Sequence, residues 1–168
     1  MGTKTLTRLI LFFFLFVRSY SFSFSHHRIH AVYNLDLFSS SQRRMLFGGG
    51  RPACIVFTDD ASRQGGRRAM LIAAKEWIAK YGVESMNFFL GDATKHVAAM
   101  KEFGLRAKDA PIAVVHHVHR QPQAKYIMNR KITYSEFTSR RLLRFFSKVK
   151  KGKVKPMKGR MKHRFEEL

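Results

Sequence analysis

The sequence predicts an α/β protein with a mixed central sheet that is flanked by helices on both faces. Short apolar, β-branched runs alternate with longer stretches whose apolar residues recur every three or four positions, which is typical of strands joined through helices. The last two apolar runs are separated only by a turn, which predicts one antiparallel pair in the sheet. A hydrophobic fraction of 45% in 168 residues is enough for the core of one domain.

The first half of the chain contains two expected strands and two expected helices. A strand is expected near residues 31–35 and a short helix near 39–47. Residues 53–58 (ACIVFT) are typical of a buried strand because they are apolar and lie between Pro52 and an Asp pair. After Gly65-Gly66, apolar residues recur at i, i+3, i+4, i+7, i+8 and i+11 of a helix that Gly82 ends: Met70, Ala73, Ala74, Trp77, Ile78 and Tyr81.

The second half continues the alternation. Strands are expected at 86–90, 112–115 and 125–128, with a helix at 93–103. A last helix is expected from about Ser135, which would be its N-cap, with Glu136 in the first turn. Its buried stripe has the spacing i, i+3, i+4, i+7: Leu142, Phe145, Phe146 and Val149.

Several short segments, in this order, resemble the protein disulfide isomerase family. Residues 101–105 (KEFGL) and then 108–111 (KDAP) are similar to the family's passage from a helix into the strand after a cis-proline, so the resemblance implies that Pro111 is that structural cis-proline. The resemblance covers about residues 31–157 and implies a thioredoxin-like fold of the non-catalytic b or b′ type. Three further segments carry it: AAKE at 73–76, KY at 125–126, and FF at 145–146 with GKVKP at 152–156.

The chain departs from the catalytic members of that family in its cysteine content. Those members carry Cys-x-x-Cys between the strand equivalent to 53–58 and the next helix, where the helix N-terminus stabilises a thiolate. Here residues 59–66 contain no cysteine, and the single cysteine, Cys54, lies within the strand. One cysteine excludes an intrachain disulfide, a dithiol redox centre and a cysteine zinc cage. We therefore expect a protein that is not an enzyme and has no cofactor, with Cys54 as a small buried hydrophobe.

The resemblance implies a function in protein folding. The family's non-catalytic client-binding domain captures unfolded or partner proteins, chaperone-style, through an exposed apolar patch. No small-molecule substrate is expected, and the oligomeric state is open. Position by position, the resemblance implies that the peptide-binding patch consists of Val56, Thr58, Met70 and Phe89. Thr58 stands where the family usually has an aliphatic residue.

The N-terminus predicts a secretory protein. Residues 1–25 are basic, then apolar from Leu9 to Val17, then rich in serine, which is the layout of a signal peptide. The apolar run would reach only about 13 Å as a helix, short of a bilayer core of roughly 30 Å. The endoplasmic reticulum lumen or secretion is therefore expected. Arg18 is unusual directly after the apolar run of a signal peptide, and an acid-free start rich in Arg, Ser and Phe is also typical of a mitochondrial or plastid transit peptide, which stays open as an alternative. A faulty start and an uncleaved anchor are open as well.

The expected organisation has three further parts. Residues 26–50 form a polar entry segment that contains the first strand and the short helix. Residues 51–151 form the core of the thioredoxin-like domain, and residues 152–168 a mobile basic tail. Because the exit near Pro156 resembles the family's linker between domains, a fragment of a longer isomerase is also open.

The charge predicts an anionic partner. The chain has 32 Lys and Arg against 11 Asp and Glu, a net charge of +21 and a pI near 10.9. Such a field attracts nucleic acid, acidic lipid or acidic protein. A basic structural or RNA-associated organelle protein is thus the alternative function, and a solubilising arm the alternative role for the tail. The candidate polyanion-binding residues are Lys150, Lys151, Lys153, Lys155, Lys158, Arg160 and Lys162.

Two other groups of polar residues predict no catalytic or metal site. His116, His117 and His119 are close in sequence, but only two of them would share a face of a strand, which is too few ligands for a metal site. Asp59 and Asp60 are expected to pair with nearby arginines in a solvated turn. No metal is therefore expected.

Overall fold

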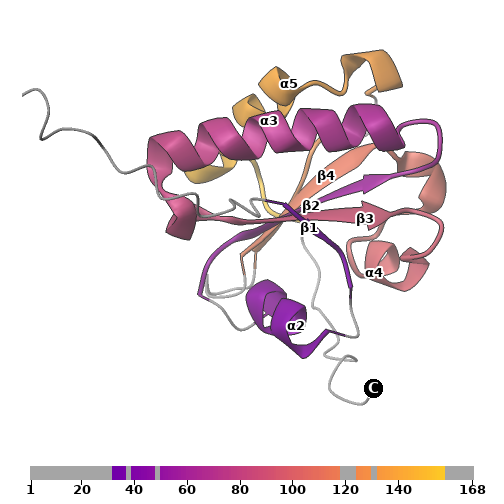
Figure 1. Ribbon diagram of the computed structural model, residues 1–168, viewed down its shortest axis with the longest axis horizontal. Helices are drawn as coiled ribbons and strands as arrows, with labels where there is room; N and C mark the ends of the chain where they lie inside the picture. The colour runs from indigo at the N-terminus through magenta and orange to yellow at the C-terminus, as the bar shows by residue number, and fades with distance from the viewer. Residues whose placement is uncertain (1–31, 37–38, 48–49, 118–123, 130–131, 158–168) are drawn as a thin grey trace, which may run out of the picture.

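The computed structural model describes residues 32–36, 39–47, 50–117, 124–129 and 132–157 (Figure 1). The expected signal peptide at 1–25 lies outside these residues, as does His119. Within the described part of the chain, no helix is both long and apolar enough to cross a membrane.

One mixed sheet forms the centre of the molecule. Its five strands lie in the order β1-β3-β2-β4-β5, with β1 and β2 parallel to β3, β4 antiparallel to β2, and β5 antiparallel to β4. The antiparallel β4–β5 pair is the one predicted from the sequence. The strands are β1 Tyr33–Asn34, β2 Ala53–Thr58, β3 Asn87–Asp92, β4 Ile112–His117 and β5 Ala124–Ile127.

Helices cover both faces of this sheet, as the sequence predicts. Figure 1 shows α3 and α5 together on one face and α2 and α4 on the other. Single 3₁₀ turns at Val83–Ser85, Ala107–Asp109 and Tyr134–Glu136 join the elements. The helices are α2 Ser40–Phe47, α3 Arg63–Tyr81, α4 Val97–Glu102 and α5 Ser139–Lys150.

The core consists of two apolar layers because successive side chains of a strand point to opposite faces. In β2, Cys54 and Val56 pack toward α3 and α5, whereas Ile55 and Phe57 pack toward α2 and α4. Adjacent residues of β3 divide in the same way, with Phe88 in the first layer and Phe89 in the second. β2 is the middle strand and is buried along its whole length.

Helix α3 begins earlier than the sequence pattern indicates. The helix already includes Gly65 and Gly66, which the pattern places before it. A Cβ on Gly66 would lie 2.4 Å from Cγ2 of Thr58. Glycine is therefore needed at position 66 because the first turn of α3 packs directly on the end of β2.

Helix α5 begins later than predicted, and Ser135 is not its N-cap. The carboxylate of Glu136 accepts hydrogen bonds from the backbone N–H and the hydroxyl of Thr133, both at 3.1 Å, which closes a separate 3₁₀ turn. The chain then passes through buried Phe137, and α5 starts after Thr138, whose hydroxyl accepts from the N–H of Arg141. The buried stripe of α5 is as predicted: Leu142, Phe145, Phe146 and Val149.

The first residues of the expected basic tail make contacts with the domain. Val154 is half-buried against the core layer under α3 and α5. The backbone N–H of Met157 donates to the carbonyl oxygen of Lys125 at 2.8 Å. Val154 and Met157 therefore contact the domain, and residues 158–168 lie outside the described part of the chain.

Candidate functional site

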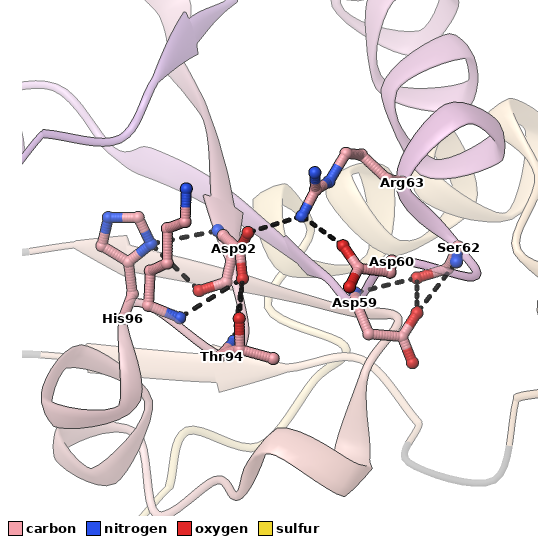
Figure 2. A network of polar contacts seen from close by, with 8 residues as sticks. Asp59, Asp60, Ser62, Arg63, Asp92, Thr94 and His96 are labelled. Atoms are coloured by element: carbon pink, nitrogen blue, oxygen red, sulfur yellow. Dashed lines mark hydrogen bonds and ion pairs between the residues drawn. The ribbon is translucent and has the colours of Figure 1, made fainter.

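The turn between β2 and α3 is the segment where the resemblance in the sequence would place a redox motif. It lies at the carboxyl end of β2, beside the end of the parallel strand β3 (Figure 2). Oδ1 of Asp59 accepts from the backbone N–H of Ser62 at 2.8 Å and from its hydroxyl at 2.6 Å. The N–H of Asp59 lies 3.1 Å from the same hydroxyl oxygen. The two side chains therefore close the turn on itself.

Asp59 also ties this turn to the segment before α5. Its other oxygen, Oδ2, accepts from the hydroxyl of Tyr134 at 2.7 Å. Burial on its own would raise the pKa of Asp59, but the hydrogen bonds from Ser62 and Tyr134 outweigh it and the pKa is lowered. Asp59 is therefore an ionised structural acceptor at neutral pH and not a proton donor.

A second set of contacts holds the end of β3 (Figure 2). The guanidinium of Arg63 lies 2.6 Å from Asp60 and 2.7 Å from Asp92. The expected pairing with an arginine is therefore confirmed for Asp60, whereas Asp59 bonds to Ser62 and Tyr134 instead. Asp92 also accepts from the hydroxyl of Thr94 at 2.6 Å and from its N–H at 2.9 Å. These bonds, with Arg63, hold the pKa of the Asp92 carboxyl below its usual range.

The site contains serine, histidine and aspartate, but they are not arranged for hydrolysis. A nucleophilic serine needs a base within hydrogen-bond reach. The Ser62 hydroxyl is bonded to Asp59, and Nδ1 of His96 accepts from the backbone N–H of Asp92 at 3.0 Å. Since Ser62 is also buried, the arrangement stabilises two loops and does not activate a nucleophile.

The one thiol of the chain lies elsewhere. Cys54 is fully buried in β2, opposite Phe88 of β3 and Val115 of β4. Burial raises the pKa of the Cys54 thiol well above its usual value. The expected burial of Cys54 within the strand is confirmed.

We expect Cys54 to react with a soluble disulfide reagent only when the whole domain unfolds. Labelling the native chain with 5,5′-dithiobis(2-nitrobenzoate) should proceed at the rate of global unfolding, whereas the chain in 6 M guanidinium should react at once. A native rate that stays the same when a core variant speeds up unfolding would contradict this.

A basic groove lies between α3 and α5. It has a volume of about 620 Å³, and two of the predicted polyanion-binding residues, Lys151 and Lys153, line it. Three further cations line it that the prediction did not name, Arg140, Arg144 and Lys148. Their spacing of i, i+4 and i+8 places them in one row on α5, and this spacing is visible in the sequence.

Of the other predicted polyanion-binding residues, Lys150 and Lys155 are not among the lining residues of this groove. The ammonium of Lys150 lies 3.4 Å from the centre of the Tyr81 ring and 5.8 Å from that of Trp77, a cation–π contact between α5 and α3. Lys155 is exposed. Lys158, Arg160 and Lys162 lie outside the described residues.

His116 of β4 is part of the packing. His116 is 1% exposed, and its ring meets that of Phe103 edge-on at 6.0 Å between centroids. Desolvation lowers the pKa of His116 to about 4, and the charge of Lys125 acts in the same direction. Among the described residues, no group of three or more potential ligands lies close enough together to hold a metal ion.

Comparisons with known proteins identify the fold. No family model and no curated protein matches the chain. Human ERp44 in its zinc-bound form matches with a TM-score of 0.56 and 13% identity, over 74% of this chain and 32% of its own. The bb fragment of ERp72 matches with a TM-score of 0.52 and 21% identity, over 75% of this chain and 51% of the fragment. Form II of human ERp44 matches with a TM-score of 0.51 and 15% identity, over 74% of this chain and 31% of its own.

The fold is thioredoxin-like. The solved structures that match are thioredoxin-like domains of the protein disulfide isomerase family, so the resemblance seen in the sequence is confirmed at the level of the fold. The chain spans about a third of ERp44 and about half of the ERp72 fragment. In this thioredoxin-like domain the Ala110–Pro111 peptide bond is cis, the isomer that the resemblance implies.

The expected peptide-binding patch is not on the surface of the thioredoxin-like domain. Val56, Met70 and Phe89 are 0% exposed and Thr58 is 4% exposed. Val56 and Met70 belong to the core layer under α3 and α5, whereas Phe89 lies in the layer on the opposite face of the sheet. The four residues therefore form neither an exposed nor a continuous surface, and their role in this structure is packing.

Replacing Val56 with alanine should accordingly lower stability by about 1.5 kcal/mol, the loss expected for two buried methylene-sized groups. The matched change Val83→Ala, at a residue that is 56% exposed, should cost less than about 0.5 kcal/mol. Urea denaturation of both variants gives the two values. Equal costs at the two positions would show that Val56 is not packed as described.

Proposed function

We propose that this chain is a redox-inactive, protein-disulfide-isomerase-like domain that binds unfolded or partner proteins in the lumen of the endoplasmic reticulum. It would hold them by contact alone, as a chaperone does, with no bond made or broken. The observation that carries the proposal is the turn before α3, where Asp59 and Ser62 bond to each other and no thiol is present.

Thiol–disulfide exchange requires an accessible thiolate and usually a resolving thiol. The chain has one cysteine, which is fully buried and whose raised pKa favours the neutral thiol. Hydrogen bonds lower the pKa of Asp59, and hydrogen bonds together with the charge of Arg63 lower the pKa of Asp92, so both carboxyls favour the ionised form. These features support a domain that acts through its surfaces and not through chemistry.

The proposed compartment rests on two supports. The first is the signal-peptide layout of residues 1–25. The second is the fold shared with protein disulfide isomerase family domains. N-terminal sequencing of the protein from cells and fractionation should give a mature chain that starts near residue 26 in the luminal fraction. An intact Met1 in a mitochondrial fraction would contradict this part of the proposal.

An aggregation assay tests binding directly. The purified chain, in equimolar to fivefold amounts, should suppress the aggregation of thermally unfolded citrate synthase at 150 mM salt. Cys54→Ala is the control: because the thiol takes no part, the folded variant should suppress aggregation equally well. An absence of suppression at fivefold excess, or its loss in the folded Cys54→Ala variant, would overturn the proposal.

A further inference from the structure

We propose that the groove between α3 and α5 binds an acidic peptide segment of a partner protein. The proposal rests on the proposed function and adds the location of the contact and the chemistry of the partner. The groove, of about 620 Å³, has a half-buried apolar residue, Leu143, among its lining side chains, together with five cations. These cations are Arg140, Arg144, Lys148, Lys151 and Lys153.

The packing of α5 explains why the cations share one surface. Phe146 and the rest of the buried stripe face the sheet and α3. The row Arg140, Arg144 and Lys148 lies on an adjacent face, and all three side chains are exposed. Side chains four residues apart on a helix are neighbours, so the three cations form a continuous strip along the groove.

The end of α5 brings the last two cations to the same surface. Gly152 has a φ of 67°, and the N–H of Lys153 donates to the carbonyl oxygen of Lys148 at 2.8 Å while that of Gly152 donates to Val149 at 3.0 Å. This pair of bonds is a Schellman motif, which folds the chain back over the last helical turn. Lys151 and Lys153 therefore extend the strip of cations instead of leading away from it.

Within the described part of the chain, the five cations are not engaged in ion pairs. None of them forms an ion pair with any residue that the structure describes, and Glu76 is the one acid among the lining residues. Other arginines of the domain do pair, as Arg141 does with Glu136 at 2.7 Å. Like charges at i and i+4 destabilise a helix, so this strip of cations lowers the stability of α5. The same cations create a positive electrostatic field over the groove.

The lining favours a peptide over the other anions. Single-stranded RNA is usually held by aromatic rings on which bases stack, and the described lining residues include no aromatic side chain. An anionic membrane favours an exposed apolar face with aromatic anchors, whereas Leu143 is half-buried within a groove. A segment with several Asp or Glu residues and one or two aliphatic ones matches both the cations and Leu143, since arginine binds carboxylates through two parallel hydrogen bonds.

The test uses the whole purified chain and fluorescence anisotropy at 150 mM salt. The probe is a fluorescein-labelled peptide of twelve residues, ten Glu and two Leu, and its counterpart has Gln in place of Glu. The groove variant is Arg140→Gln/Arg144→Gln/Lys148→Gln. The control variant, Lys95→Gln/Lys101→Gln/Lys108→Gln, removes the same charge from exposed residues around α4, on the opposite face of the sheet. Circular dichroism and thermal melts establish that both variants are folded.

The glutamate peptide should bind the wild-type chain and the glutamine peptide should not. The groove variant should bind at least roughly tenfold more weakly, and the control variant within about twofold of wild type. Equal losses in both variants would show attraction by net charge alone and overturn the proposal. The proposal would also be overturned if a twelve-nucleotide single-stranded RNA, or vesicles with 30% phosphatidylserine, bound the groove more tightly than the glutamate peptide does.

The aggregation assay separates this inference from the proposed function. If the chain suppresses aggregation but the groove variant binds the acidic peptide as well as wild type does, the groove proposal is wrong and the proposed function stands. If suppression is absent while groove-dependent peptide binding is present, the chaperone-type function is wrong and the acidic-peptide site stands.

Discussion

Replacing Phe146 with alanine is expected to lower the free energy of unfolding by about 3–5 kcal/mol, which is the usual cost of removing a buried aromatic ring from a core. Phe146 is 0% exposed and sits where α5 packs on α3 and the sheet. Its ring lies 5.6 Å from that of Trp77 and 5.9 Å from that of Phe88. The loss is a large fraction of the 5–15 kcal/mol that holds a typical domain together.

Urea denaturation followed by far-ultraviolet circular dichroism and by Trp77 fluorescence gives this value. Trp77 is the only tryptophan of the chain, so the two signals also test whether unfolding is a single transition. Phe146→Leu is the control and should cost no more than about 1.5 kcal/mol, because it keeps most of the apolar volume. A loss below about 1 kcal/mol for Phe146→Ala would mean that α5 does not complete the core.

Lowering the pH from 7 to 5 is expected to destabilise the domain by about 2 kcal/mol through His116 alone. The pKa of His116 is lowered from 6.5 to about 4, first by desolvation and then by the charges of Lys125 and His117. Between these two values the unfolded chain binds a proton that the folded chain does not. Stability is therefore fully present above about pH 6.5 and is lost as the pH falls toward 4.

The surroundings of His116 explain why its protonation destabilises the folded state. It is paired across the sheet with Ala53 of β2 and Lys125 of β5, and the ring of Phe103 lies against it. The ammonium of Lys125 donates to the carbonyl oxygen of Glu102 at 2.6 Å, so a positive charge is held close to the imidazole. Desolvation lowers the pKa of Lys125. The pKa values of Asp59, Asp92 and Glu136 are lowered from ordinary values that already lie below pH 5.

Urea denaturation at pH 7, 6 and 5 measures this effect. His116→Phe is the control, since phenylalanine fills much of the same space and cannot be protonated. The variant should lose about 2 kcal/mol less than the wild type between pH 7 and pH 5. Equal pH dependence in the two proteins would show that His116 does not carry the effect.

The sequence was sufficient to predict the architecture because the spacing of its apolar residues distinguishes the strands from the helices. The runs ACIVFT and IAVV are apolar throughout, as expected of strands covered on both faces, and both are found in the middle of the sheet. The stripe that includes Phe146 indicates the buried face of α5. The short turn between the last two runs indicates their antiparallel pairing.

Boundaries that depend on tertiary contacts could not be predicted in the same way. Two adjacent glycines usually interrupt a helix, yet Gly65 and Gly66 both lie within α3. Thr58 leaves no room for a Cβ at position 66, so the glycine there is needed for the helix to pack on β2. Ser135 followed by Glu136 is a reasonable start for a helix, but the Glu136 carboxylate closes a turn on Thr133 instead. In both cases a contact that local propensity does not encode decided the outcome.

In the candidate site, too, some features could be predicted from the sequence and others required the structure. The absence of a redox motif and the burial of Cys54 followed from residue types and the strand pattern. The four patch residues were placed by resemblance, and resemblance does not indicate which face of the sheet a helix covers in this chain. The basic row on α5 could have been found from its spacing, but the turn at Gly152 that joins Lys153 to it required the structure.

Catalysis of dithiol exchange is the most direct test of the central claim, which is that this thioredoxin-like domain acts by contact and not by electron transfer. The purified chain should not accelerate the reduction of insulin by dithiothreitol, nor the oxidation of a dithiol peptide by glutathione disulfide, above the rates measured with the Cys54→Ala variant. Multiple turnovers that disappear in the folded Cys54→Ala protein would contradict the account.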